Sequence, residues 1–189
     1  SQTLIQELNK IHADGRGLVG YSSLTGANAV SSNTAALDSA GLDLTPSSGQ
    51  FDLVITNTST GERVTTSPIS VTASTTTLDS LATAITSESV RITATANANG
   101  TLSIATSSGY TVAFEGDTSN VLAALGLNSF YTGSDASDIA VNSTLVSTPA
   151  LLAVGQSEMQ GDNTNARAMA ELRDSLLMGS STQSFEQYY

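Results

Sequence analysis

Few side chains in this sequence could carry out chemistry. His12 is the single histidine among 189 residues, and there is no cysteine. A Ser-His-Asp relay would have to use His12, yet no nucleophile motif of the G-x-S-x-G kind accompanies it. Without cysteine, a disulfide framework, a zinc–thiolate site and a cysteine nucleophile are excluded. We interpret His12 as a residue at the end of a helix, near the negative pole of the helix dipole.

The glycines of residues 15–20 match the dinucleotide-binding pattern G-x-G-x-x-G. That motif requires a strand before it and a helix after it, whereas here a helical pattern precedes it and no convincing helix follows. A phosphate-binding loop is also excluded, because the only lysine, Lys10, is followed by Ile11 instead of Ser or Thr. We expect these glycines to end the first helix and to form a flexible turn.

Carboxylates are the remaining candidates. Asp135 and Asp138 could contribute to a calcium site, but their loop lacks the ligand ladder, central glycine and closing glutamate of an EF-hand. A turn and cap role is expected for them, and residues 162–165 are interpreted as a loop and N-cap before the last long helix. Seventeen acids leave a glycosidase pair open, although the aromatic platforms usual in sugar sites have no Trp to draw on. We expect no catalytic residue, no cofactor and no metal.

Composition and charge exclude further classes. The net charge of −11 repels phosphate backbones and anionic membrane surfaces, so neither nucleic acid nor membrane is an expected partner. Ser and Thr make up roughly 29% of the chain and charged residues only 12%, so the surface must be mostly hydroxyl and amide. Such surfaces are common in extracellular bacterial proteins. No apolar run is long enough to cross a membrane.

Both ends of the chain carry helical patterns. Leu4, Leu8 and Ile11, joined by Ile5, recur at helical spacing before the glycines. Residues 16–41 are expected to be extended or looping, with a short helix near residues 34–37. A helix starts at Pro149, and another over residues 166–178 places Met169, Leu172 and Leu176 on one face. Residues 185–189 look like the first turn of one more helix.

The middle of the chain alternates in the manner of strands. Residues 51–55 and 64–71 are predicted to pair across a turn at residues 59–61, with Pro68 placing the return strand at an edge. A helix follows, with Thr76 as N-cap and Asp79 completing a capping box. Residues 90–96, 102–104 and 110–114 predict a three-stranded antiparallel meander. A short helix near residues 121–125 is capped by Asp117 or Thr118 and ended by Gly126, and residues 139–141 predict a strand.

Together these elements predict an α+β fold. The two amphipathic ends lack partners nearby in sequence, so we expect the first helix to pack against the last ones. Residues 1–42 and 128–189 would then form one discontinuous, helical, rod-like domain. Residues 43–127 would form an inserted, β-rich outer domain of antiparallel strands and short helices.

Three stretches together resemble the flagellar hook-associated protein 1 family (FlgK), which joins hook to filament. Residues 4–18 contain Asn9-Lys10-Ile11-His12 before a glycine-rich turn, like the family's Asn-x-Ile-His segment. Residues 130–142 are the most family-specific run, and residues 161–189 hold Asp162-Asn163-Thr164-Asn165 and the aromatic end. The order and spacing of the three match. Residues 77–104 are similar to an insert motif shared by flagellins, cap and junction proteins.

The resemblance implies a structural subunit of the bacterial flagellum and not an enzyme. Family members are exported by the flagellar type III apparatus without a cleavable signal peptide and act outside the cell. They assemble as a ring, with hook protein on one side and the second hook-associated junction protein on the other. The family's terminal coiled-coil helices are absent from this chain, so we expect a central fragment, monomeric in solution and without the site for the export chaperone.

Contact residues are less defined. Phe185, Tyr188 and Tyr189 are candidates to pack on a continuing helix or on a neighbouring subunit, or else in the core. Two other functions stay open at this point. A bacterial adhesin or other surface-binding module would suit the Ser/Thr-rich, lysine-poor β segment. A hydrolase would need a deep cleft with converging carboxylates.

Overall fold

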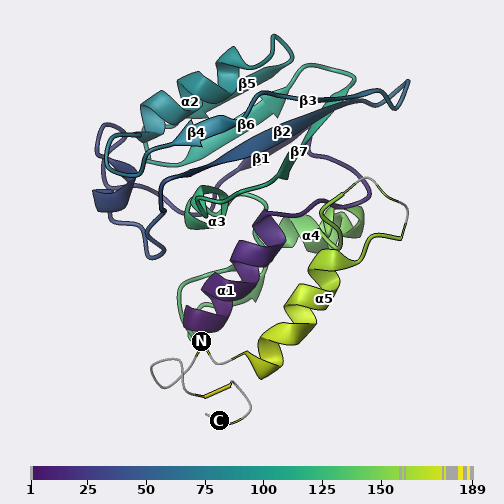
Figure 1. Ribbon diagram of the computed structural model, residues 1–189. Coiled ribbons are helices and arrows are strands. Elements are labelled where there is room, and N and C mark those ends of the chain that lie inside the picture. The colour runs from purple at the N-terminus through teal and green to yellow at the C-terminus, as the bar shows by residue number, and fades with distance from the viewer. Residues whose placement is uncertain are drawn as a thin grey trace.

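The computed structural model describes residues 2–157, 159, 161–175, 177, 183–184 and 187. Antiparallel sheets occupy one end of the molecule, with one long helix on their outer face, and most of the other helices gather at the opposite end (Figure 1). The predicted α+β fold class is confirmed. The helices of the described residues are α1 (Gln2–Ala13), η1 (Leu37–Ser39), α2 (Leu78–Ser87), α3 (Val121–Ala124), α4 (Ser143–Ser147), η2 (Pro149–Leu151), α5 (Thr164–Glu171) and η3 (Leu172–Asp174).

The strand β2 (Gly49–Asn57) is the centre of a four-stranded sheet. Along one edge it pairs with β4 (Ile69–Val71) near its start and with β3 (Arg63–Thr65) near its end. Along the other edge it pairs with β7 (Tyr110–Glu115). The predicted turn and the edge position of the return segment are confirmed. Pro68 lies in the connection between β3 and β4, where no ladder bond is required of it.

A second sheet has the order β1 (Ser23–Thr25), β6 (Leu102–Thr106), β5 (Ile92–Ala96). The β5–β6 hairpin is as predicted, with Gly100 at φ 84° in its turn. The predicted three-stranded meander is wrong, because β7 pairs with β2 and not with β6. The free edge of β6 is taken by β1, from a Ser/Gly-rich segment that we expected to be extended or looping, without a named strand. Three residues are too few to show the period of a strand.

Residues 21–25 connect the two sheets. Tyr21 exchanges both backbone hydrogen bonds with Val112 of β7, each with a nitrogen–oxygen distance of 2.8 Å. Two residues later the same segment becomes β1 and pairs with β6. This segment therefore joins the sheets by main-chain bonds from one to the other.

The helix α2 covers β5 (Figure 1). Its capping box uses Thr77 and Ser80, one residue later than predicted: the amide of Ser80 donates to Thr77 Oγ1, and the amide of Thr77 donates to Ser80 Oγ. Thr86 Oγ1 also accepts from the amide of Ala94, at 2.9 Å. This bond occupies a backbone donor on β5, the edge strand of its sheet.

The core is aliphatic, with few aromatic members. Phe51 of β2 and Phe114 of β7 are both fully buried. The short helix α3 is buried along its whole length and packs against α1. Gly126, at φ 70°, ends it as predicted. Full burial of each leucine of this core stabilises the fold by roughly 1.5–3 kcal/mol, so a chain with no Trp still has a substantial core.

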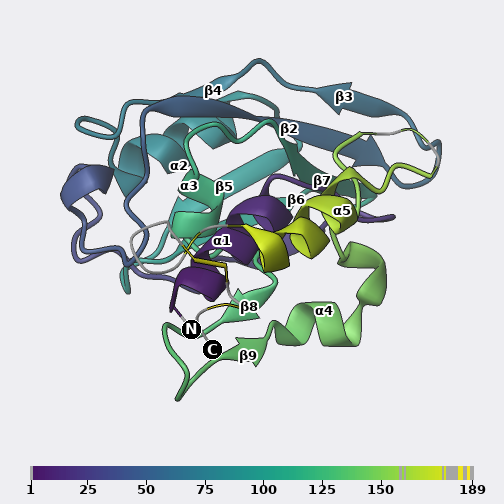
Figure 2. The same ribbon diagram turned by 60° about the horizontal axis from the view of Figure 1, so that its bottom comes forward.

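At the helical end, α1 and α5 lie side by side (Figures 1 and 2). The hairpin of β8 (Tyr131–Thr132) and β9 (Ala140–Val141) borders α1 on another side through β8, and α4 follows β9 (Figure 2). The predicted contact between the first and last helices is confirmed. Pro149 opens η2 as predicted, although as a 3-10 turn.

Two details of the helical end differ from the sequence-based prediction. The helix expected over residues 166–178 starts at Thr164 and turns into a 3-10 helix at Leu172, which ends at Asp174. The stripe Leu4, Leu8 and Ile11 is only half-buried, since the side that α1 buries is centred on Ile5 and His12. Leu176 lies outside the described residues.

The proposed division into residues 1–42 with 128–189, and 43–127, stays a prediction. The strand β1 belongs by sequence to the first part and pairs with β6 of the second. One cluster of buried apolar side chains also runs from Ala13 through the sheets to Leu151. The two parts therefore share a core.

Candidate functional site

The side of α1 that faces the protein is partly polar. Asn9 and His12, three positions apart, point the same way and are 7% and 0% exposed. Buried polar side chains require partners, and these two find theirs in segments more than a hundred residues away. We call Asn9, His12, Tyr21, Asn128 and Asn165 the polar junction.

Asn9 binds the backbone that leads into β8. Its Oδ1 accepts from the amides of Phe130, at 3.0 Å, and Tyr131, at 2.8 Å. Its Nδ2 donates to the carbonyl of Tyr131 at 2.9 Å. The side-chain amide of Asn9 thus satisfies backbone groups of this segment that a neighbouring strand would otherwise bind.

His12 binds two backbone groups through its two ring nitrogens. Nδ1 donates to the carbonyl of Asn128 at 2.6 Å, so Nε2 is the acceptor for the amide of Ala153 at 3.0 Å. The ring also meets Phe130 edge-on, with centroids 5.7 Å apart. Burial lowers the pKa of His12, against the opposing effect of the Asn128 carbonyl. The expected helix-end position is confirmed, and burial there favours the neutral form of the ring.

Asn128 closes the end of α1. It adopts φ 48°, a left-handed conformation that Asn tolerates better than most residues. Its Nδ2 lies within hydrogen-bond distance of the carbonyls of His12, Ala13 and Gly15. Tyr21 donates its hydroxyl proton to Asn128 Oδ1 at 2.8 Å, and burial raises the pKa of Tyr21 to about 12.

Asn165 ties α5 to α1. Its Nδ2 donates to the carbonyl of Ile11 at 2.7 Å, and the residue is fully buried. The loop before it is ordered by Asp162, whose carboxylate accepts from the amides of Gln156, Ser157 and Thr164. Hydrogen bonds from the Thr164 side chain and backbone are the largest causes that lower the pKa of Asp162. The expected loop is confirmed for Asp162 and Asn163 only, because Thr164 and Asn165 already belong to α5.

The G-x-G-x-x-G pattern has a packing explanation. A Cβ on Gly15 would overlap the side chain of Asn165, and one on Gly17 would overlap the carbonyl of Ala150. A Cβ on Gly20 would lie 2.8 Å from the carbonyl of Val112. The helix stop is confirmed, but the turn is anchored instead of flexible, because the side chain of Asn165 and the backbones of Ala150 and Val112 each approach too closely to leave room for a Cβ.

We call residues 150–155 the strap. Its middle is held by the bond from Ala153 to His12. Its ends are held by backbone bonds from the amide of Val19 to Ala150, at 3.2 Å, and from the amide of Arg16 to Gly155, at 2.9 Å. The strap thus fastens to α1 and to the glycine-rich turn.

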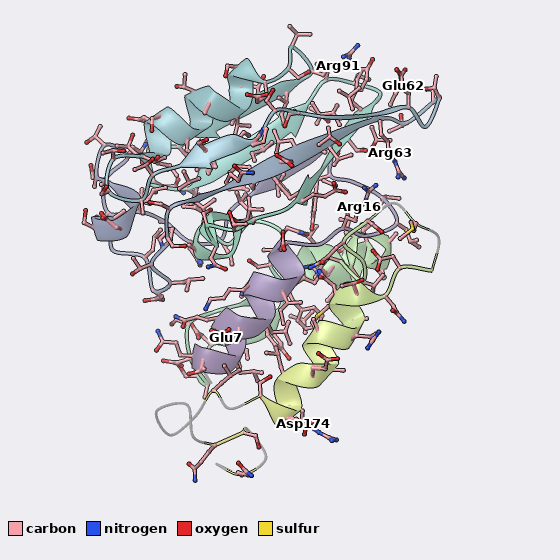
Figure 3. The ribbon with its side chains drawn as sticks, in the orientation of Figure 1. Glu7, Arg16, Glu62, Arg63, Arg91 and Asp174 are labelled. Carbon is pink, nitrogen blue, oxygen red and sulfur yellow. The ribbon has the colours of Figure 1, made fainter. Side chains whose placement is uncertain are left out.

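Charged groups flank the polar junction. Arg16 forms a salt bridge with Glu115 of β7 at 2.5 Å, with the Arg16 side chain only 7% exposed. Figure 3 shows Arg16 near Arg63, and the two line the same hollow of about 170 Å³. Asp14 accepts from the amide of Asp117 at 2.6 Å. Desolvation by burial, with a smaller contribution from the charge of Asp117, raises the pKa of Asp14 to about 6.

The loop of Asp135 and Asp138 is a set of turns. Asp138 Oδ1 accepts from the amides of Ser134 and Asp135, and Asp135 Oδ1 accepts from the amide of Ser137. Hydrogen bonds from the side chain and backbone of Ser137 lower the pKa of Asp135, and those from the amides of Asp135 and Ser134 lower the pKa of Asp138. The predicted turn and cap role is confirmed. Among the described residues, no group of three or more His, Asp or Glu could hold a metal ion.

The arrangement of the polar junction suits holding and not reacting. Both nitrogens of His12 are engaged by backbone groups, and the ring has no exposed surface with which to meet a substrate. A general base must lie within hydrogen-bond distance of the substrate proton that it takes.

No helix in the described part of the chain is long and apolar enough to span a membrane.

Sequence reasoning missed most of the polar junction. Asn128 and Asn165 carry no local signal of their partners, which lie 107 to 154 positions away. Asn9 and Asn165 were noted only as parts of motifs, and His12 only as a motif residue at a helix end. The predicted contact residues Phe185, Tyr188 and Tyr189 lie outside the described residues.

Comparison with known proteins adds little. No protein-family model and no curated protein matches the sequence. Among solved structures, the D2–D3 domains of the flagellar cap protein FliD from Serratia marcescens align at 20% identity and a TM-score of 0.38. The alignment covers 60% of this chain and 56% of that one, so the chain spans little more than half of that structure. At such a TM-score the alignment supports no conclusion about fold or function.

Proposed function

We propose that this chain is a structural part of the bacterial flagellum, at the junction between hook and filament, and that it catalyses no reaction. The single observation that carries the proposal is the convergence at the polar junction. The three stretches that resemble the hook-associated protein 1 family are far apart in the sequence. In the fold, Asn9 of the first stretch binds Phe130 and Tyr131 of the second, and Asn165 of the third binds Ile11 of the first.

This convergence explains in structural terms why the motifs contain these polar residues. The Asn-x-Ile-His segment supplies Asn9 and His12, which fix the helical end to the backbone of residues 128–131 and 153. The third stretch supplies Asn165, which fixes α5 beside α1. Residues that hold one fold together are expected to recur together in proteins that share this fold, even where the surface residues of those proteins differ.

The proposed role depends on shape. In a ring, one subunit must present the same faces to its neighbours at every position. A polar junction whose side chains bind backbone at fixed distances holds the helical end at one angle to the sheets. Partners under this proposal are further copies of the full-length protein, hook protein and the second hook-associated junction protein. The location is outside the cell, after type III export without a cleavable signal, and this chain alone is monomeric.

Immunogold electron microscopy of intact cells of the source bacterium tests the location. Antibodies raised against this chain should label one band between each hook and its filament. Antibodies against the bacterium's flagellin, used as the control, should label the filament along its length. Label on the cell surface away from flagella would replace the proposal with an adhesin, and label only at filament tips would replace it with a cap protein.

A further inference from the structure

We propose that His12 is an acid-sensitive latch: a second proton on its ring releases the strap, residues 150–155, from α1 while the sheets stay folded. The latch is a property of the fold and does not depend on the role proposed above.

The geometry leaves only one place for the proton. Nδ1 already carries a hydrogen, which it donates to the carbonyl of Asn128 at 2.6 Å. The second proton must bind Nε2, which accepts from the amide of Ala153 at 3.0 Å. Two N–H groups would then face each other across that distance, and Ala153, which is fully buried, would have no acceptor in place.

Release of the strap need not disturb the sheets. The bonds at its two ends go to Val19 and Arg16, which precede the first strand. None of the ladder bonds of β2 or β6 involves a strap residue. Opening therefore breaks the contact of the strap with the end of α1 and the bond from the amide of Ala166 in α5 to the carbonyl of Val154, and it breaks no main-chain pair of either sheet.

The charged groups around His12 do not supply an alternative switch at the same bond. Lys10 precedes His12 on α1, and Asp14 and Arg16 follow the end of that helix. Tyr21 donates to Asn128, Tyr131 follows Phe130 on the segment that packs against the ring, and α5 carries Arg167 and Glu171. The strap itself contains no titratable side chain. Asp14 acts in the opposite direction, because its raised pKa makes the folded protein take up a proton as pH falls below about 6.

Because the pKa of His12 is lowered in the closed latch, acid favours the open form. In the unfolded or opened chain the pKa of His12 is near its ordinary value of 6.5, and in the closed latch it is lower. Between these two values the closed form holds one proton fewer than the open form. Closing then weakens by up to about tenfold for each pH unit below about 6.5.

Amide hydrogen exchange of the ¹⁵N-labelled chain, measured between pH 8 and pH 4.5, tests the latch. Protection factors correct for the intrinsic pH dependence of exchange. The protection of Ala153 should fall by up to about tenfold per pH unit below about 6.5, with Val19 and Arg16 following. The protection of Val112, which donates to Tyr21 in the seam between the sheets, should stay within about threefold.

Two variants separate His12 from its neighbours. His12→Gln should remove the pH dependence at Ala153, even if its protection is lower throughout. Asp14→Asn should leave that dependence in place. Ring ¹⁵N shifts of the unaltered chain provide a test that needs no variant: they should show the Nδ1–H tautomer at pH 8 and a pKa below 6.5.

Three results would overturn the latch. The first is a His12 pKa at or above 6.5. The second is an equal loss of protection at Ala153 and Val112, which would mean global unfolding. The third is an Ala153 amide whose protection does not change in acid.

Discussion

The side-chain amide of Asn165 donates a 2.7 Å hydrogen bond to the backbone carbonyl of Ile11, across 154 positions of the chain. The acceptor lies within three residues of the end of α1, where carbonyls have no partner inside the helix. One residue of the last described α-helix therefore completes the first helix. This pair holds together the two ends of the described chain.

Removing that donor should destabilise the fold. Asn165→Ala leaves the Ile11 carbonyl unpaired in a buried place, and we expect a loss of roughly 1–3 kcal/mol in the free energy of unfolding. Urea titration followed by circular dichroism measures it. Asn163→Ala is the matched control, since Asn163 is exposed and makes no capping bond with its side chain. Equal losses for the two variants would contradict the role given to Asn165.

Asn9 should matter more than a neighbouring amide with one exposed bond. Asn9→Ala removes three hydrogen bonds to residues 130 and 131, and we expect a loss of roughly 2–4 kcal/mol. Gln6→Ala on the same helix removes one exposed bond to the carbonyl of Asp43 and should cost less than about 1 kcal/mol. Urea unfolding of both variants provides the comparison, and a smaller loss for Asn9→Ala would contradict the assignment.

Gly17 should not tolerate a methyl group. A Cβ there would overlap the carbonyl of Ala150 and lie 2.6 Å from the carbonyl carbon of Leu151, so the strap would have to move. We expect Gly17→Ala to cost roughly 1–3 kcal/mol through overpacking, measured as a lower midpoint in urea.

Gly61→Ala is the control for backbone effects in the glycine series. Gly61 has φ 72° and open space around its Cβ position, so alanine there should cost about 1 kcal/mol through conformation alone. We therefore expect Gly17→Ala to lose more stability than Gly61→Ala. A Gly17→Ala variant as stable as the unaltered chain would show that the turn at residues 15–20 can shift to admit a methyl group.

Asp14 should lower stability at neutral pH. Its pKa is raised to about 6 in the folded chain, mainly by burial, from an ordinary value of 3.8. The folded state therefore binds the proton more tightly, and the cost of ionising Asp14 grows as pH rises from about 4 to about 6. Asp14→Asn keeps an acceptor for the Asp117 amide and should stabilise the chain by roughly 1 kcal/mol at pH 7, after allowance for solvent screening.

Thermal or urea unfolding at pH 7 and pH 3.5 measures this effect. The advantage of Asp14→Asn should vanish at the lower pH, where Asp14 is protonated in both states. Asp79→Asn, at an exposed position of α2, removes the same charge elsewhere. An equal gain from Asp79→Asn would point to net charge and not to the buried position of Asp14.

Local patterns predicted local structure well. The alternation of Phe51, Leu53 and Ile55 identified β2, and the glycines after residue 13 located the end of α1. Thr77 and Ser80 share the capping chemistry of the predicted pair one residue earlier, so the helix was found with a shifted cap. These signals depend on neighbours within four residues.

Pairing between distant segments was harder to predict. Whether β7 pairs with β6 or with β2 depends on which of these strands has a free edge. The edge of β6 is taken by β1, and β1 is too short to be recognised as a strand in the sequence. The buried polar side chains of α1 interrupted its apolar stripe, so the side facing the core was misjudged. For the candidate site, the sequence supplied a motif around His12, while its partners Asn128 and Ala153 could be found only from the fold.

The position of the sheets between α1 and α5 along the chain has a kinetic consequence. The bonds from Asn9, His12 and Asn165 each close a loop of more than a hundred residues, whereas the β5–β6 hairpin closes a turn of a few. Loop closure costs entropy that only later contacts offset, so folding should begin in the sheets and α1 should dock late. Changes at these three residues should then speed unfolding more than they slow folding.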